Sequence, residues 1–181
     1  MGRKNSTQGT PATAALTAAG VSFVLHPYTH DPAAASYGAE AAEVLGIDPS
    51  RVFKTLMVEV EGRLAVGIVP VSGSLDLKAM AAALGAKNAA MADPGAAQRR
   101  TGYVLGGISP LGQRQPSPTV LDSSALAFGT ILVSGGRRGL DIELAPADLA
   151  RLTDAVTAPI SSLAAGSSRP GQRPVREPPA T

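Results

Sequence analysis

Two apolar runs separated by a short turn constrain the fold of this chain more than any other feature. Residues 52–59 and 63–69 have the length and composition of β-strands, and Glu61-Gly62 lies between them. This spacing predicts an antiparallel β-hairpin. A sheet that contains such a hairpin is not the all-parallel, doubly wound type. We therefore expect a mixed α/β fold in which a curved, barrel-like sheet is flanked by helices.

Proline and glycine mark the ends of the remaining elements. Proline at the first helical position predicts helix starts at Pro11, Pro94 and Pro146. Gly20 and Gly46 predict helix ends. The expected helices are residues 11–19, 39–45, 75–84, 94–100 and 146–155. The expected strands are residues 22–26, 52–59, 63–69, 119–122, 130–134 and 140–144.

The ends of the chain differ in composition from its body. Residues 1–9 and 162–181 are rich in Gly, Ser, Pro, Gln and Arg, so they bury too little apolar surface to offset the entropy of ordering. We expect flexible tails there, around a single domain at residues 10–161. No fixed-period repeat or internal linker divides that domain.

Composition excludes several classes of site. The chain has no cysteine, so it has no disulfide, no thiolate zinc site and no thiol nucleophile of its own. It has neither a secretory signal nor an apolar run of about 18 residues, which predicts a cytoplasmic protein without a membrane segment. The net charge is +2, but the body carries 11 basic and 13 acidic side chains. Any contact with phosphates must therefore come from local basic clusters.

A lysine interrupts the first apolar run. Lys54 lies within residues 52–58, where a central strand leaves little water on either face. An ammonium group is costly there unless it reaches solvent or an anionic partner. One interpretation is a lysine whose stem packs while its ammonium reaches water. The other is a cation that lines a pocket and faces a phosphate, a carboxylate or an ester.

A glycine-rich segment, residues 106–112, follows Tyr103-Val104-Leu105, which we interpret as a strand. Gly106 and Gly107 allow backbone N–H groups to approach a ligand, as an oxyanion site requires, although ordinary turns use the same residues. The segment is neither a Walker loop nor a dinucleotide fingerprint. Ser109 precedes a proline outside any Gly-x-Ser-x-Gly elbow, which argues against a serine nucleophile.

A second glycine-rich turn, residues 135–139, joins two expected strands and carries Arg137 and Arg138. These guanidinium groups either contact phosphates or lie at a solvated hairpin tip. Asp141 follows the turn. It either orients an amino or hydroxyl group of a ligand or lies exposed on its strand.

Both histidines of the chain lie within residues 26–31, together with Tyr28 and Asp31. Such a group can bind metal or transfer protons, but its spacing fits no standard zinc site and there is no third histidine. We expect a hydrogen-bonded loop and no metal. Tyr28 in such a loop can form the wall of a pocket and contact a ligand through its hydroxyl.

Five short motifs occur in a specific order. They are Phe53-Lys54-Thr55-Leu56, Met91-Ala92-Asp93, Thr101-Gly102-Tyr103, residues 106–112 and residues 134–140. Together they resemble the YbaK family of bacterial Cys-tRNA(Pro) deacylases, from Thr10 to about Ala155. That family is related to the editing insertion domain of bacterial prolyl-tRNA synthetases and to freestanding Ala-tRNA(Pro) deacylases.

The resemblance implies a compact α/β fold with a pocket for an aminoacylated 3′ adenosine, and no cofactor. The implied partners are aminoacylated tRNA(Pro) and prolyl-tRNA synthetase. Lys54 is then the key lysine of the family, placed on the phosphate or ribose of the terminal nucleotide. The other implied site residues are Gly106 and Gly107 as oxyanion donors, and Tyr28, Ser109 and Asp141 as substrate-binding residues.

The mechanism of the YbaK family suits a chain without cysteine. The substrate's own cysteine thiolate attacks its ester carbonyl, which releases the tRNA and leaves a thiolactone that opens in water. Orientation of the thiol contributes several kcal/mol, and each oxyanion donor about 3 kcal/mol. One alternative is an Ala-tRNA(Pro) deacylase with a water nucleophile. Another is a noncatalytic module that binds tRNA or a synthetase.

Overall fold

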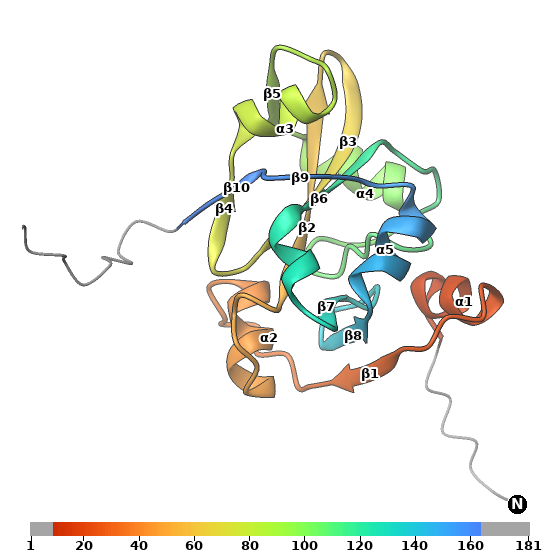
Figure 1. Cartoon of the computed structure of the whole chain (residues 1–181). Helices are drawn as coiled ribbons and strands as arrows, with labels where there is room; N and C mark the ends of the chain where they lie inside the picture. Colours follow the sequence, from red (N-terminus) through yellow and green to blue (C-terminus); the bar gives the residue numbers. More distant parts are fainter. Residues whose placement is uncertain (1–8, 164–181) are drawn as a thin grey trace, which may run out of the picture.

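The computed structural model describes residues 9–163 of the chain (Figure 1). Its helices are α1 (Pro11–Ala18), α2 (Tyr37–Leu45), α3 (Leu77–Ala83), α4 (Pro94–Thr101), α5 (Pro146–Thr153) and the 3-10 helix η1 (Ser123–Ala127). Its strands are β1 (Val24–Pro27), β2 (Phe53–Val60), β3 (Arg63–Pro70), β4 (Gly73–Leu75), β5 (Ala89–Met91), β6 (Thr119–Asp122), β7 (Ile131–Ser134), β8 (Leu140–Leu144), β9 (Val156–Ala158) and β10 (Ser161–Leu163).

The predicted tails fall largely outside the described residues. Gly9 is the one described residue of the expected N-terminal tail. At the other end, Ser162 and Leu163 form part of β10, which pairs with β4. The described part of the chain therefore extends two residues beyond position 161.

The strands form three sheets in residues 9–163. The largest has the order β5-β2-β3-β6-β9, in which β5, β2 and β3 are antiparallel neighbours and β6 and β9 are parallel to β3. A second sheet has the antiparallel order β1-β8-β7, and β4 pairs with β10. The expected mixed α/β class is confirmed. The described strands form no closed barrel, so the barrel-like detail is not supported.

The two larger sheets meet at the beginning of β2. Val52 forms an isolated parallel bridge with Leu132 of β7, and the Leu132 N–H donates to the Arg51 carbonyl at 2.9 Å. At the opposite end of β2, β5 pairs with residues 58–60. Figure 1 shows β7 and β5 at these two ends of the strand. β2 therefore has different neighbours along the same edge.

Local sequence signals explain the ends of most elements. Thr10 and Asp93 cap α1 and α4, each immediately before a proline, and Gly46 closes α2 in the left-handed conformation at φ 65°. The β2–β3 turn has positive φ at both Glu61 and Gly62, as a two-residue hairpin of the primed type requires. The hairpin and the proline-marked helix starts are confirmed.

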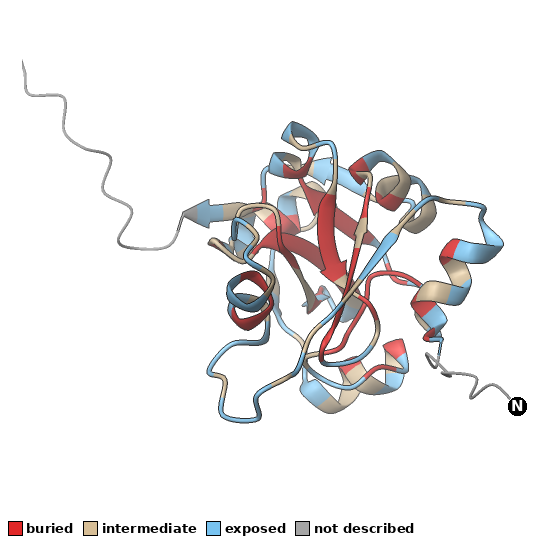
Figure 2. Ribbon diagram, turned by 90° about the horizontal axis from the view of Figure 1, so that it is seen from below, coloured by how far each residue is buried: buried red, intermediate tan, exposed pale blue. Residues whose placement is uncertain are grey.

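The core lies on both faces of the central sheet. Phe53 and Met57 pack with Leu16 of α1 on one face, and Val58 packs with Met80 of α3 on the other. Figure 2 shows that buried residues concentrate on the central strands, while the helices carry pale blue, exposed residues on their outer sides. The alternation along β2 thus assigns successive side chains to different faces.

The structure differs from the expected elements in three main respects. The segment at 103–105 is not a strand: it leads into a turn in which the Gly107 N–H donates to the Val104 carbonyl. The helix expected at 75–84 spans Leu77–Ala83, and Leu75 belongs to β4. The strands β4, β5, β9 and β10 were not expected. Each has only three residues and is defined by pairing with a partner distant in sequence.

Candidate functional site

A cavity of about 550 Å³ lies along the edge of β2. β7 bridges this edge at Val52 and β5 pairs with it only from Val58, so residues 53–57 have no strand neighbour on that side. This stretch of the β2 edge, between the residues that contact β7 and those that pair with β5, is called the gap in β2 below. The cavity lies along it. Its walls come from β2, the start of α2, the 105–108 segment and the facing ends of β7 and β8.

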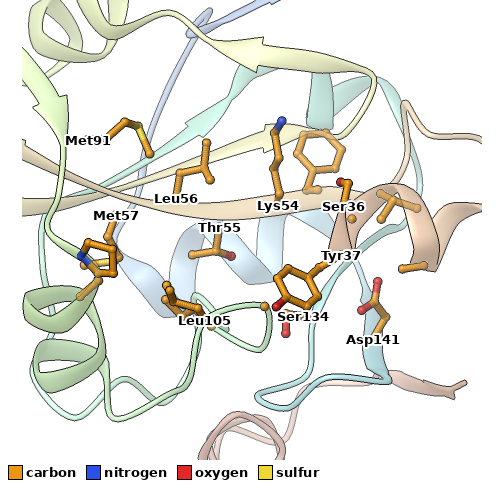
Figure 3. A pocket seen from close by; sticks show the side chains of 18 of the residues that line it. Ser36, Tyr37, Lys54, Thr55, Leu56, Met57, Met91, Leu105, Ser134 and Asp141 are labelled. Carbon is orange, nitrogen blue, oxygen red and sulfur yellow. The ribbon is translucent and has the colours of Figure 1, made fainter. Parts of the chain in front are cut away.

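Lys54 lines the cavity from the gap in β2. Figure 3 shows Lys54 on the opposite side of the strand from Thr55 and Asp141. Desolvation lowers the pKa of its ammonium group, and it forms no ion pair within residues 9–163. Lys54 therefore lines a cavity, and the anionic group that its ammonium would face stays a prediction. A partly desolvated cation without an acidic partner favours an anionic ligand.

Asp141 on β8 lies on the other side of the cavity. Its exposed fraction is 6%, which rules out the alternative of an exposed strand residue. Burial raises the pKa of its carboxyl group to about 7. Asp141 can thus exchange a proton, or become a charged partner for an amino group, near neutral pH.

Tyr28 also lines the cavity, directly after β1. Its N–H donates to the Gly139 carbonyl at 2.9 Å, which fixes it beside the turn that precedes Asp141. Burial, and then the charges of Asp141 and Glu40, raise the pKa of the Tyr28 hydroxyl to about 12. The hydroxyl stays protonated and can donate a hydrogen bond to a ligand.

Tyr37, in the first turn of α2, also lines the cavity and was not predicted from the sequence. Its ring packs on Gly106, where a Cβ would be 2.7 Å from a ring carbon. The Arg138 guanidinium lies 5.1 Å from the ring centroid, and Arg138 also donates from Nε to the Leu105 carbonyl at 2.9 Å. Nothing in the sequence distinguished Tyr37 from an ordinary residue in the first turn of a helix.

The glycine-rich segment contributes less to the cavity than the sequence suggested. Gly106 lines the cavity, with φ 82°. Gly107 does not: its N–H is bonded to the Val104 carbonyl, which removes it as an oxyanion donor in this structure. Ser109 is fully buried, and its Oγ accepts the Leu111 N–H at 3.2 Å. Ser109 does not line the cavity, and its contact with a substrate stays a prediction.

The histidine-rich segment is a hydrogen-bonded loop, as expected. His26 Nε2 lies 2.7 Å from Glu143 Oε1, and His30 Nδ1 lies 2.8 Å from Glu40 Oε2. The two rings therefore have separate carboxylate partners. Within residues 9–163, no group of three or more His, Cys, Asp or Glu side chains is placed to hold a metal ion.

The helices of residues 9–163 are also too short or too polar to cross a membrane.

Comparison with known proteins gives this geometry a family. The model of the aminoacyl-tRNA editing domain matches residues 31–152, which include all the cavity-lining elements from α2 to β8. The chain belongs to the aminoacyl-tRNA editing domain family. The resemblance seen in the sequence motifs is thereby confirmed.

Two bacterial proteins resemble this chain over most of their length. EbsC of Enterococcus faecalis, assigned provisionally as a Cys-tRNA(Pro)/Cys-tRNA(Cys) deacylase, is 40% identical over 122 residues, or 67% of this chain and 74% of EbsC. The uncharacterized protein YwhH of Bacillus subtilis is 32% identical over 115 residues, or 63% of this chain and 73% of YwhH.

A solved structure supports the same editing-domain fold. A crystal structure described provisionally as a trans-editing enzyme for prolyl tRNA synthetase superposes with a TM-score of 0.72 at 25% identity. The match covers 84% of this chain and 95% of the other.

Proposed function

We propose that this editing domain is a deacylase that hydrolyses mischarged Cys-tRNA(Pro) in trans. The observation that carries the proposal is that Lys54, which has no ion pair among residues 9–163, and a buried carboxyl group line one cavity of a chain without cysteine. The lysine suits an anionic nucleotide, and the buried carboxyl group suits an amino group. The names given to EbsC and to the similar crystal structure favour the same substrate class.

The gap in β2 suggests where the two parts of such a substrate bind in the cavity. The terminal nucleotide lies on the Lys54 side, where a point cation contacts a phosphate or ribose oxygen. The amino acid lies on the Asp141 side, where the carboxylate binds its ammonium group and Tyr28 donates to an ester or ribose oxygen. This arrangement keeps the roles implied for Lys54, Tyr28 and Asp141 by the sequence.

The bond changes follow from the substrate's own thiol. The cysteine thiolate attacks the ester carbonyl, a carbon–sulfur bond forms, and the bond from that carbon to the ribose oxygen breaks. The ribose oxygen takes a proton, and water then opens the thiolactone to free cysteine. The protein contributes orientation and stabilisation of the oxyanion. The Gly106 N–H, which has no hydrogen bond within residues 9–163, is the donor we assign.

An Ala-tRNA(Pro) deacylase is the second candidate function. Alanine has no thiol, so this reaction needs an activated water. Asp141 is the observation that favours this candidate, because a carboxyl group with a pKa near 7 is suited to act as a general base on water. The two candidates thus differ in the nucleophile, not in the fold.

Single-turnover hydrolysis of tRNA(Pro) charged with Cys, Ser, Ala or S-methylcysteine tests the proposal. Wild type and Lys54→Ala are compared, with Lys78→Ala as the matched control, because Lys78 is exposed on α3 and outside the cavity. We expect fast loss of Cys alone, at a much lower rate in Lys54→Ala when the enzyme is not saturating and at the wild-type rate in Lys78→Ala. Release of Ala instead would favour the water nucleophile. If neither Cys nor Ala were released, both deacylase activities would be excluded.

We further propose that the protein acts with prolyl-tRNA synthetase in the cytoplasm. The body of the chain carries a net charge of about −2, which predicts weak affinity for tRNA alone. Binding of tRNA(Pro) by the full chain is measured with and without prolyl-tRNA synthetase. Equal affinity in the two cases would contradict the need for this partner.

A further inference from the structure

The gap in β2 exposes backbone groups as well as side chains. Alternate residues of a strand direct their N–H and C=O groups to opposite neighbours. The Val52 carbonyl accepts from Val71 beside β3, and the Met57 carbonyl accepts from Ala92 on the β5 side. By this alternation the peptide groups of Thr55 and the N–H of Met57 face the gap. No described strand pairs with them there.

The Thr55 side chain has an unsatisfied group at the same place. Thr55 lines the cavity, and its Oγ1 is the one buried side-chain nitrogen or oxygen atom without a hydrogen bond among residues 9–163. A buried hydroxyl without a partner is costly, so it is rarely retained without a role. A ligand that fills the cavity can supply the missing partner.

The surroundings of Thr55 indicate which part of a ligand it meets. Figure 3 shows the Thr55 side chain on the same side of β2 as Tyr37, Ser134 and Asp141, and opposite to Lys54. These residues therefore line the cavity on one side of β2, next to an edge with no strand neighbour among residues 9–163. Such an edge matches a short, backbone-like ligand that has both a donor and an acceptor.

We infer that Thr55 holds the aminoacyl group of the substrate. Its peptide N–H and C=O bind the amino acid's carbonyl and amino groups as a neighbouring strand would. Its hydroxyl hydrogen-bonds a polar side chain of the bound amino acid and so selects small polar amino acids over alanine. The inference rests on the proposed function, to which it adds a specificity-determining residue and an anchoring edge.

The first test replaces the hydroxyl while keeping the shape of the side chain. Thr55→Val removes the hydroxyl, and Thr55→Ser is the matched control that retains it. We expect kcat/KM for Cys-tRNA(Pro) to fall about 10- to 100-fold in Thr55→Val and less than about threefold in Thr55→Ser. The Tm of Thr55→Val should equal or exceed that of wild type, because an unsatisfied hydroxyl is removed.

Two results of this test would overturn the inference. One is wild-type kcat/KM in Thr55→Val. The other is a lowered Tm with a parallel loss of activity, which would make Thr55 a folding residue. Failure of the proposed function is distinct, because wild type itself would then release no amino acid from any charged tRNA(Pro).

The second test reads binding without turnover. Adenosine that carries cysteine through a 3′-amide in place of the ester is titrated into the ¹⁵N-labelled full chain. We expect the amide signals of Thr55 and Met57 to shift, and those of Leu56 and Val58, which are directed to β3, to remain near their starting positions. Equal shifts at all four amides, or none at Thr55 and Met57, would overturn the anchoring edge.

Discussion

Gly107 packs directly on the backbone of Arg137: a Cβ at Gly107 would be 2.8 Å from the Arg137 Cα. This contact joins the two glycine-rich segments, 106–112 and 135–139, which are separate motifs in the sequence. Thr10 also contacts the second segment, because its Oγ1 donates to the Gly135 carbonyl at 2.5 Å. The 106–112 segment, which lines the cavity at Gly106 and Ile108, therefore packs on the 135–139 turn.

Gly107→Ala should destabilise the protein by about 1 to 3 kcal/mol, because the added methyl group meets backbone that cannot move aside easily. Gly129→Ala is the matched control, since a Cβ there has no atom within 4 Å. Urea unfolding of the two variants and wild type measures the difference. Equal stability of Gly107→Ala and wild type would contradict the close packing.

Asp141 should make the protein less stable as the pH rises. Its folded pKa of about 7 lies above the unfolded value of about 4, so the folded state binds the extra proton between these values. The free energy of unfolding should therefore fall from pH 4 to pH 7, by on the order of 3 to 4 kcal/mol from this group, and then level off.

Asp141→Asn should remove this contribution and be more stable than wild type above pH 7. Urea unfolding at several pH values compares wild type, Asp141→Asn and Glu59→Gln, an exposed acidic control on β2. The difference between wild type and Asp141→Asn should grow with pH. A constant difference would show that the Asp141 carboxyl group ionises normally.

Glu40 should hold the loop after β1 in place through its charged form. The Asp31 N–H donates to Glu40 Oε1 at 2.6 Å and His30 contacts Oε2; these contacts hold the pKa of Glu40 below its usual value. Because the folded pKa is lowered, this stabilisation is present above about pH 4 and is lost as the pH falls through the folded value.

Glu40→Gln should loosen the same contact at neutral pH. We expect faster hydrogen exchange at the Asp31 amide in this variant, and unchanged exchange in Glu43→Gln, because Glu43 is exposed on the same helix. Protection of the Asp31 amide that is the same in Glu40→Gln and wild type would mean that another group holds the loop.

The contribution of Lys54 to binding should depend on salt. Lys54→Ala should raise the KM for aminoacylated tRNA about tenfold or more at low ionic strength, and the difference from wild type should narrow as salt screens the phosphate contact. Lys54→Arg should retain part of the affinity, because the charge remains while the shape of the contact changes. A salt-independent loss in Lys54→Ala would place Lys54 away from the phosphates.

The different environments of the two glycines at the start of the 106–112 segment could not be predicted from the sequence. Gly106 and Gly107 are adjacent and equivalent as a pattern, yet one lines the cavity and the other packs on Arg137. Tyr37 was overlooked because its role depends on Gly106 and Arg138, which are distant in sequence. Neither distinction follows from the local properties of these residues.

The sequence by itself determined the β2–β3 hairpin, the proline-marked helix starts and the ordered motifs that indicated the family. These features depend on local backbone preferences and on neighbouring residues, so they can be read along the chain. Tertiary structure alone decided that β7 and β5 leave residues 53–57 of β2 without a strand neighbour on the edge opposite β3, and that Asp141 lines the cavity there. Long-range strand pairing created the cavity, and burial in it set the pKa of Asp141.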